Sequence, residues 1–263
     1  MSSTVSSRAG IPTARRIVVK VGSSSVSGAN VGQIGALVDA LASAHGRGSE
    51  VILVSSGAIA TGIPYLKLDA RPTDLATQQA AAAVGQNVLI FRYQESLDRY
   101  SIVAGQILLT AGDMENPTHR SNAQRAMERL LGLRILPIVN ENDTVATQEI
   151  RFGDNDRLAA MVSVLISADV LVLLSDIDAL YTMPPGTPGA RKIEHVPFDD
   201  DLSGVTFGTI GAAGVGTGGA GTKVAAAKLA AASGIPTLLT ATGSVDEALT
   251  GADIGTWFEA AEL

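Results

Sequence analysis

Residues 140–156 read Asn-Glu-Asn-Asp-Thr-Val-Ala-Thr-Gln-Glu-Ile-Arg-Phe-Gly-Asp-Asn-Asp, and they follow an apolar run, residues 135–139, that predicts a buried strand. Five residues of this stretch are acidic and three are asparagines. A packed core favours apolar side chains and a solvated face favours lysine and glutamate, so neither explains the composition. One interpretation is a turn held by local Asn and Asp side-chain bonds. The other is a site that holds a cationic ligand group and orders nearby lysines.

The chain on either side alternates between short apolar runs and longer helical patterns. Further buried strands are predicted over residues 16–21, 50–54, 102–109, 169–174 and 236–241. Helices are predicted over residues 31–45, 73–100, 121–131, 156–167 and 222–234, with Ser121 spaced for a capping box and Gly85 weakening the second helix. This alternation predicts an α/β fold, with a mainly parallel central sheet and helices on both faces.

Bulk composition excludes several classes of function. The 263 residues are 46% hydrophobic but only 4% aromatic, so the core must be built from Ala, Val, Ile and Leu. The net charge of −7 gives no electrostatic basis for binding nucleic acid or an anionic membrane. The absence of cysteine excludes disulfides and thiolate metal sites. No apolar run approaches the roughly 20 residues that span a bilayer, and the start lacks a secretory signal, so we expect a cytoplasmic protein. We expect residues 1–13, which are rich in serine, to be a disordered tail.

Two predicted strands end in small residues. Residues 16–21 lead into Gly22 and three serines, with Lys20 near the end of the strand, and residues 50–54 lead into Ser55, Ser56 and Gly57. Ligands bind at the C-terminal ends of strands in open α/β sheets, and small residues there let an anion approach backbone N–H groups. Lys20 at such a position indicates function more than an edge-strand lysine that reaches water.

A third glycine-rich stretch, residues 214–223, precedes a helix that is rich in alanine. It contains G-x-G-x-x-G twice, but it does not follow the first strand of a βαβ unit, so we reject a dinucleotide site. It also differs from a P-loop, because Thr222-Lys223 stands where Lys-Thr or Lys-Ser is required. Lys223 in a first helical turn opposes the helix dipole unless it meets an anion. The pattern therefore predicts a phosphate contact on exposed N–H groups and Lys223.

Together these features favour phosphoryl transfer. Lys20 and Lys223 could neutralise a phosphoryl group, and Asp154 and Asp156 could hold the lysines in place. No Ser-His-Asp arrangement is evident, and phosphoryl transfer depends mainly on positioning and charge neutralisation.

At the level of motifs the chain resembles the glutamate 5-kinases of the amino acid kinase family. The resemblance extends from about Arg16 to the C-terminus, in the family's order. Its motifs are residues 18–24 (VVKVGSS), 55–60 (SSGAIA), 140–147 (NENDTVAT), 152–156 (FGDND), 173–176 (LLSD), 180–182 (LYT) and 216–223 (GTGGAGTK).

The resemblance implies a three-layer αβα sandwich over residues 14–263. It also implies transfer of the γ-phosphoryl group of ATP to the γ-carboxylate of L-glutamate, the first step of proline synthesis. It makes Lys20, Lys223, Asp156 and Asp154 the catalytic residues. Mg²⁺ would be bound mainly through the ATP phosphates, with no protein metal site. The implied partners are L-glutamate, proline as a feedback inhibitor and a further copy of the chain, as a dimer or tetramer.

The remaining contacts follow from the same resemblance. Glutamate contacts fall on Ser56, Gly57, Asp143 and Asn155. Nucleotide contacts fall on Lys20, Gly22, Ser175, Asp176, Thr217, Gly218, Gly219, Ala220, Gly221, Thr222 and Lys223.

The sequence departs from the family's pattern in places. Many members carry a C-terminal PUA domain, which we expect to be absent here. Arg151 and Ala179 stand where lysine and glycine are common, and Ala220-Gly221 makes the nucleotide loop small. Two alternatives stay open: a related kinase acting on N-acetylglutamate, aspartate or a nucleoside monophosphate, and a non-catalytic sensor of nucleotide or amino acid on the same fold.

Overall fold

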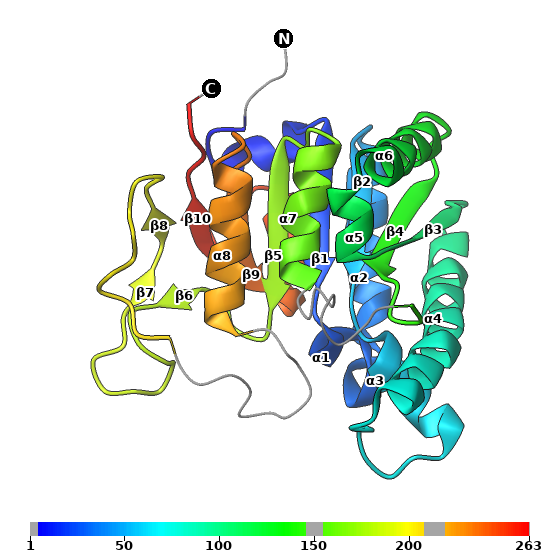
Figure 1. The fold of residues 1–263 in the computed structure, drawn as a ribbon. Coiled ribbons are helices and arrows are strands. Elements are labelled where there is room, and N and C mark those ends of the chain that lie inside the picture. The colour runs from blue at the N-terminus through cyan, green and yellow to red at the C-terminus, as the bar shows by residue number, and fades with distance from the viewer. Residues whose placement is uncertain (1–4, 146–154, 208–218, 263) are drawn as a thin grey trace.

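A central sheet organises the chain. The computed structural model describes residues 5–145, 155–207 and 219–262 (Figure 1). Within them the main sheet has eight strands in the order β3-β4-β2-β1-β5-β9-β10-β8. All of its pairings are parallel except that of β9 with β10. The strands are β1 (Arg16–Val21), β2 (Glu50–Ser55), β3 (Ala104–Leu109), β4 (Leu136–Glu141), β5 (Val170–Ser175), β8 (His195–Val196), β9 (Thr237–Ala241) and β10 (Thr256–Phe258). A separate pair joins β6 (Leu180–Tyr181) to β7 (Lys192–Ile193).

Helices cover both faces of the sheet. One core cluster joins it to α2 (Gln33–Gly46), α4 (Leu75–Asp98) and α9 (Val245–Leu249), and a second joins it to α6 (Pro117–Gly132), α7 (Asn155–Leu165) and α8 (Ala220–Ala231). In Figure 1, α7 and α8 lie in front of the strands and α2 behind them. The predicted α/β fold, a three-layer αβα arrangement on a mainly parallel sheet, is confirmed. No helix of the described ranges is both long and apolar enough to cross a membrane.

The short helices lie mainly between strands and longer helices. They are α1 (Ser23–Val26), α3 (Ala58–Gly62), α5 (Ala111–Glu115), η1 (Arg8–Thr13), η2 (Gly28–Asn30), η3 (Ile63–Leu66) and η4 (Thr242–Ser244).

The central strand β1 decides where Lys20 points. Successive side chains of a strand face opposite sides of a sheet. Ile17 and Val19 pack into the cluster on the α2 side, and Val18 packs into the cluster on the α7 and α8 side. Lys20 shares the face of Val18, so it points toward the layer formed by α7 and α8.

Two local expectations were wrong. The helix predicted from Ser121 begins at Pro117, because Asn116 Oδ1 accepts from the backbone N–H groups of Thr118 and His119 at 2.9 and 3.1 Å. The short helix before it, α5, is capped reciprocally by Thr110 and Asp113. Residues 8–13, assigned from sequence to a disordered tail, form a 3₁₀ helix, because burial of Ile11 ties this segment to the core.

The glycine expected to weaken α4 instead permits close helix packing. At Gly85 an added Cβ would lie 1.7 Å from the carbonyl oxygen of Ala58, so only glycine allows α3 to approach α4 this closely. The helix continues through Gly85 without a break.

Candidate active site

Two lysines and one aspartate meet at the C-terminal end of β1. Lys20 Nζ forms an ion pair with Asp156 Oδ1, and Lys223 Nζ lies 3.0 Å from Asp156 Oδ2. Asp156 stands in the first turn of α7 and Lys223 in the first turn of α8. Three segments widely separated in sequence therefore form one ionic cluster, which we call the ionic trio.

The ionic trio is almost completely buried. Asp156 is 0% exposed, Lys20 4% and Lys223 7%. Burial by itself raises the pKa of the Asp156 carboxyl, but the charges of Lys20 and Lys223 outweigh that effect and hold the pKa well below its usual range. Two ammonium groups and one carboxylate give the trio a net charge of +1. The trio is therefore suited to an anionic group brought by a ligand.

The start of α8 adds donors beside the trio. Gly219 is the N-cap residue, and no side chain of the described residues caps this helix. Thr222 Oγ1 lies 3.0 Å from Asp156 Oδ2 and 2.9 Å from the Gly219 carbonyl, and its one hydroxyl proton is shared between these acceptors, which ties the first turn of α8 to α7. Ala220 and Gly221 complete a small-residue start of the kind that suits a phosphate at a helix N-terminus.

Next to the trio lies a cluster of uncharged polar groups, which we call the amide cluster. Asn155, at the start of α7, has three acceptors within hydrogen-bonding distance of Nδ2, and these share its two N–H groups: Ser56 Oγ at 2.9 Å, Asn140 Oδ1 at 3.0 Å and the Ser55 carbonyl at 3.1 Å. Asn140 Oδ1 also accepts from the backbone N–H of Glu141 at 2.8 Å. These donations fix the Asn155 amide. Its Oδ1 is buried, and no described residue supplies a hydrogen bond to it, so it is suited to accept from a ligand donor.

The two glycine turns predicted at the ends of β1 and β2 are present. Gly22 is the N-cap of α1, and Gly57 is the N-cap of α3. Gly57 has φ 98°, a left-handed conformation that favours glycine, and a Cβ there would approach Val26 Cγ2 at 3.3 Å.

Ser175 ends β5 and Asp176 follows it, and both are held by groups that sequence reasoning missed. Ser24 Oγ donates to Asp176 Oδ1 at 2.7 Å. Ser25 Oγ lies 2.7 Å from Thr242 Oγ1, which donates to the Ser175 carbonyl at 3.3 Å. These bonds join the turn after β1 to the loops after β5 and β9. The serines of the β1 turn could have indicated this link, but nothing in the sequence marks Thr242.

Some of the predicted site residues are not placed by these contacts. Asp143 is half-buried and lies in the turn after β4. Asp154, Thr217 and Gly218 lie outside the described residues. Asn140 was missed as a member of the amide cluster, although the asparagine-rich stretch that contains it was the strongest signal.

The protein supplies no metal cage within the described residues. No group of three or more His, Asp or Glu side chains there is arranged to hold a metal ion. Mg²⁺ prefers to keep several waters and to bind through phosphate oxygens, so this donor set fits a Mg²⁺ ion that arrives on a nucleotide.

Comparisons with known proteins show the family and the fold. The chain is 74% identical over 252 residues to the glutamate 5-kinase of Clavibacter sepedonicus, covering 96% of this chain and 97% of that protein. It is 72% identical to the glutamate 5-kinase of Leifsonia xyli subsp. xyli, covering 98% and 96%. A solved structure of carbamate kinase from Giardia lamblia, bound to AMP-PNP, has the same fold, with a TM-score of 0.68 at 15% identity over 95% of this chain and 100% of that one. The amino acid kinase family profile matches residues 15–241, and the chain belongs to the amino acid kinase family.

Proposed function

We propose that the protein transfers the γ-phosphoryl group of ATP to the γ-carboxylate of L-glutamate. The products are L-glutamyl 5-phosphate and ADP, and the reaction is the first step of proline biosynthesis. The observation that carries the proposal is the ionic trio, two buried lysines on one buried carboxylate at the C-terminal end of the sheet. Close relatives named glutamate 5-kinase support the choice of acceptor.

Phosphoryl transfer requires little proton chemistry from this site. A γ-carboxylate is already ionised at neutral pH, so one of its oxygens attacks the γ-phosphorus without a general base. The bond from that phosphorus to the bridging oxygen of ADP breaks, and ADP leaves with the electron pair. Lys20 and Lys223 neutralise charge on the transferring group, and Asp156 keeps both ammonium groups in place.

The rest of the machinery falls on either side of the trio. The start of α8 and the loop after β5 receive the nucleotide, through Gly219, Ala220, Gly221, Ser175 and Asp176. Mg²⁺ carried by the phosphates offsets their charge. We assign residues 14–263 to this single kinase domain, with Asp154, Thr217 and Gly218 completing its site.

The amide cluster receives the amino acid. The free carbonyl face of Asn155 suits an ammonium donor, and Ser56 beside it offers a hydroxyl. Asp143 pairs with the α-ammonium by charge. This pairing distinguishes a free amino acid from N-acetylglutamate, which has no ammonium group.

Release of ADP tests the reaction class and the acceptor together. Wild-type protein with Mg-ATP is given L-glutamate, N-acetyl-L-glutamate or L-aspartate, and hydroxylamine traps any acyl phosphate as a hydroxamate. We expect ADP and hydroxamate with L-glutamate only. Turnover with another acceptor alone would retain the kinase and overturn the substrate. Folded protein that binds ATP but turns over none of the three would be a sensor.

A substitution at Asp143 tests the recognition of the ammonium group. We expect Asp143→Asn to raise the KM for L-glutamate about 10-fold or more and to leave the KM for ATP unchanged, because a charge-assisted bond of about 1.5–3 kcal/mol is lost. Equal losses for the two substrates would contradict this assignment. Asp201→Asn, at an exposed aspartate that follows β8, is the control.

We further propose that the chain forms a homo-oligomer in the cytoplasm and that L-proline inhibits it. Among the described residues β3 is an edge strand of the main sheet, and Val103 beside it and Phe91 on α4 are 56% and 64% exposed. Paired copies would cover this apolar edge.

Light scattering tests the assembly. We expect Phe91→Glu to have a smaller molar mass in solution than the wild type. Initial rates with L-proline against D-proline test the inhibition.

A further inference from the structure

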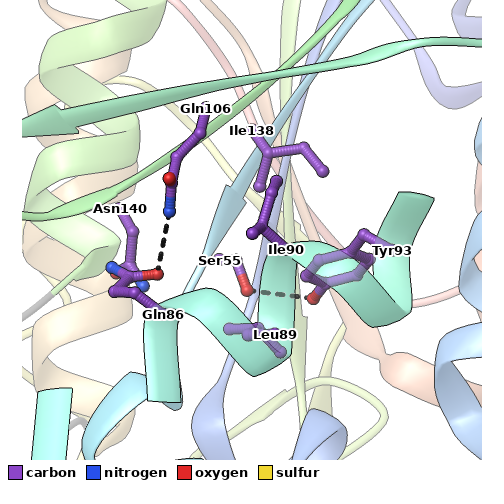
Figure 2. Close-up of a pocket in the computed structure, with 8 residues that line it drawn as sticks. All are labelled: Ser55, Gln86, Leu89, Ile90, Tyr93, Gln106, Ile138 and Asn140. Atoms are coloured by element: carbon purple, nitrogen blue, oxygen red, sulfur yellow. Dashed lines mark hydrogen bonds between the residues drawn. The ribbon is translucent and has the colours of Figure 1, made fainter. Parts of the chain in front are cut away.

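A small polar cavity lies behind the amide cluster, between α4 and the strands β2, β3 and β4. Its volume is about 10 Å³, which is room for about one water molecule. Figure 2 shows the eight side chains that line it. They are Ser55, Gln86, Leu89, Ile90, Tyr93, Gln106, Ile138 and Asn140. Asn140 belongs to the amide cluster, and the Ser55 carbonyl accepts from Asn155 of that cluster. The cavity therefore adjoins the amide cluster.

Two of the polar contacts around the cavity are long. Gln106 Nε2 lies 3.5 Å from Gln86 Oε1, and Gln86 Nε2 lies 3.4 Å from the carbonyl oxygen of Glu141. Ordinary N–H···O bonds have donor–acceptor distances of about 2.7–3.2 Å. The glutamine amides therefore retain hydrogen-bonding capacity toward the cavity. By contrast, Ser55 Oγ and Tyr93 Oη, which also line the cavity, form a bond of usual length with each other, at 2.9 Å.

Asn140 brings a buried donor to the same place. Its Oδ1 accepts two hydrogen bonds, from Asn155 Nδ2 and from the Glu141 N–H, and both partners are donors. The amide therefore cannot be reversed, because Nδ2 would then face two donors. In the present orientation Nδ2 is buried and has no hydrogen-bond partner among the described residues. Such a donor destabilises the fold unless something accepts from it.

We propose that the cavity is a site for one ordered water molecule, and that Gln86 and Gln106 hold this water against Asn140 as positioning residues for the amino-acid end of the active site. The water accepts from Asn140 Nδ2 and bonds to the glutamine amides. It thereby satisfies the one unmet donor of Asn140 and fixes the Oδ1 that orients Asn155, whose amide in turn contacts Ser56. The functional part of this proposal rests on the proposed glutamate kinase activity.

The chain of contacts predicts a selective effect on one substrate. Gln86 is buried in α4, and an apolar side chain of similar length removes both polar atoms of its amide from the cavity without leaving a large void. The water then has too few polar partners, and Asn140 and Asn155 lose their fixed orientation. The nucleotide side of the site, which is held through Thr242 and Asp176, is not part of this chain of contacts.

The test compares Gln86→Met with Gln124→Met, a control on α6 whose amide nitrogen lies 3.5 Å from Glu128 Oε1 on the same helix. We expect Gln86→Met to raise the KM for L-glutamate about 3- to 10-fold, the equivalent of losing one hydrogen bond, with the KM for ATP unchanged. Gln86→Glu, which keeps polar atoms in the cavity, should recover part of this loss. We expect Gln106→Leu, at an exposed position of the edge strand β3, to raise the KM for L-glutamate in the same way, with less risk to folding.

A crystal structure of the wild-type protein without substrate gives an independent result. We expect electron density for one water within hydrogen-bonding distance of Asn140 Nδ2, and its absence in Gln86→Met. Absence of that water in the wild type would overturn the site. An unchanged KM for L-glutamate in both glutamine variants, with the water present, would overturn the positioning role. If the wild type does not phosphorylate L-glutamate, the proposed function fails, but the density still decides the water site.

Discussion

Asn155 and Asp156 are neighbours at the start of α7, yet they organise two polar regions of opposite character. Asp156 gathers two lysines into a buried ionic trio, and Asn155 gathers Asn140 and Ser56 into an uncharged amide cluster. A buried ion pair that loses one partner leaves an uncompensated charge, whereas a lost amide bond costs far less. The ionic trio should therefore couple stability to turnover, and the amide cluster should govern recognition of the amino acid.

The strongest test of this difference removes the shared carboxylate. Asp156→Asn leaves Lys20 and Lys223 close together without a counter-charge, so we expect the free energy of unfolding to fall by about 3–5 kcal/mol. We expect kcat to fall by roughly 10³-fold, because neither lysine is held where charge develops. Urea denaturation and ADP release measure the two effects.

The control for this change is Asp253→Asn, which removes the carboxylate of an ion pair with Arg8. Asp253 is 94% exposed, and exposed pairs contribute little, so stability and turnover should be close to wild type. If Asp156→Asn were no less stable than Asp253→Asn, the trio would not hold the two helices at this end of the sheet.

Lys223→Met separates catalysis from stability. Asp156 keeps Lys20 and the Thr222 hydroxyl as partners, so the variant should remain folded with a melting temperature near that of wild type. We expect kcat to fall about 10²- to 10³-fold, because one cation that stabilises the transferring phosphoryl group is lost. Steady-state rates and a thermal melt check both parts.

Lys228→Met, one turn and a half further along α8, is the matched control. It changes the same residue type on the same helix away from the trio, and its rate should be normal. Near-normal turnover of Lys223→Met would remove Lys223 from the transfer step and favour a sensor.

How far the sequence predicts each region also differs. The trio residues were predicted, because a lysine in an apolar strand and a lysine in a first helical turn both conflict with local preference unless they serve a site. The fold followed from the alternation of apolar runs and helical patterns. Thr242 and Gln86 were not predicted, because a threonine after a strand and a glutamine in a helix conflict with nothing. Their contacts depend on which loops the sheet order brings together, and on how closely Gly85 lets α3 approach α4.

Thr242→Val tests whether an uncharged bond can matter on the nucleotide side as well. Valine keeps the shape of threonine but cannot bond to Ser25 or to the Ser175 carbonyl. We expect the KM for ATP to rise about 3- to 10-fold and the KM for L-glutamate to stay unchanged, since about one hydrogen bond that positions the loop after β5 is lost. Thr242→Ser should restore the wild-type value. A larger effect on glutamate than on ATP would mean that the two sides are not separable.

The smallest expected effect lies at the opposite end of the sheet, where His45 and Arg134 bond to each other. His45 Nδ1 accepts from Arg134 Nη2 at 3.1 Å, and His45 Nε2 donates to the Arg134 carbonyl at 3.1 Å. Burial and the charge of Arg134 both lower the pKa of His45 below 6.5, so the folded protein favours the neutral ring. Because the folded pKa lies below the unfolded one, this contribution to stability is complete above about pH 6.5 and is lost as the pH falls through the folded value.

Thermal melts from pH 8 to pH 5 check this expectation. The melting temperature of the wild type should exceed that of His45→Gln at pH 8, and the difference should shrink as the pH falls, because glutamine cannot take up the proton that disfavours the folded state. Turnover measured at pH 8 should be the same for both, since the pair lies at the N-terminal ends of the strands and away from the ionic trio. If the difference in melting temperature instead grew toward acid pH, the fold would stabilise protonated His45 beside the charged Arg134. It would then bring cations together at this end of the sheet as well as in the ionic trio.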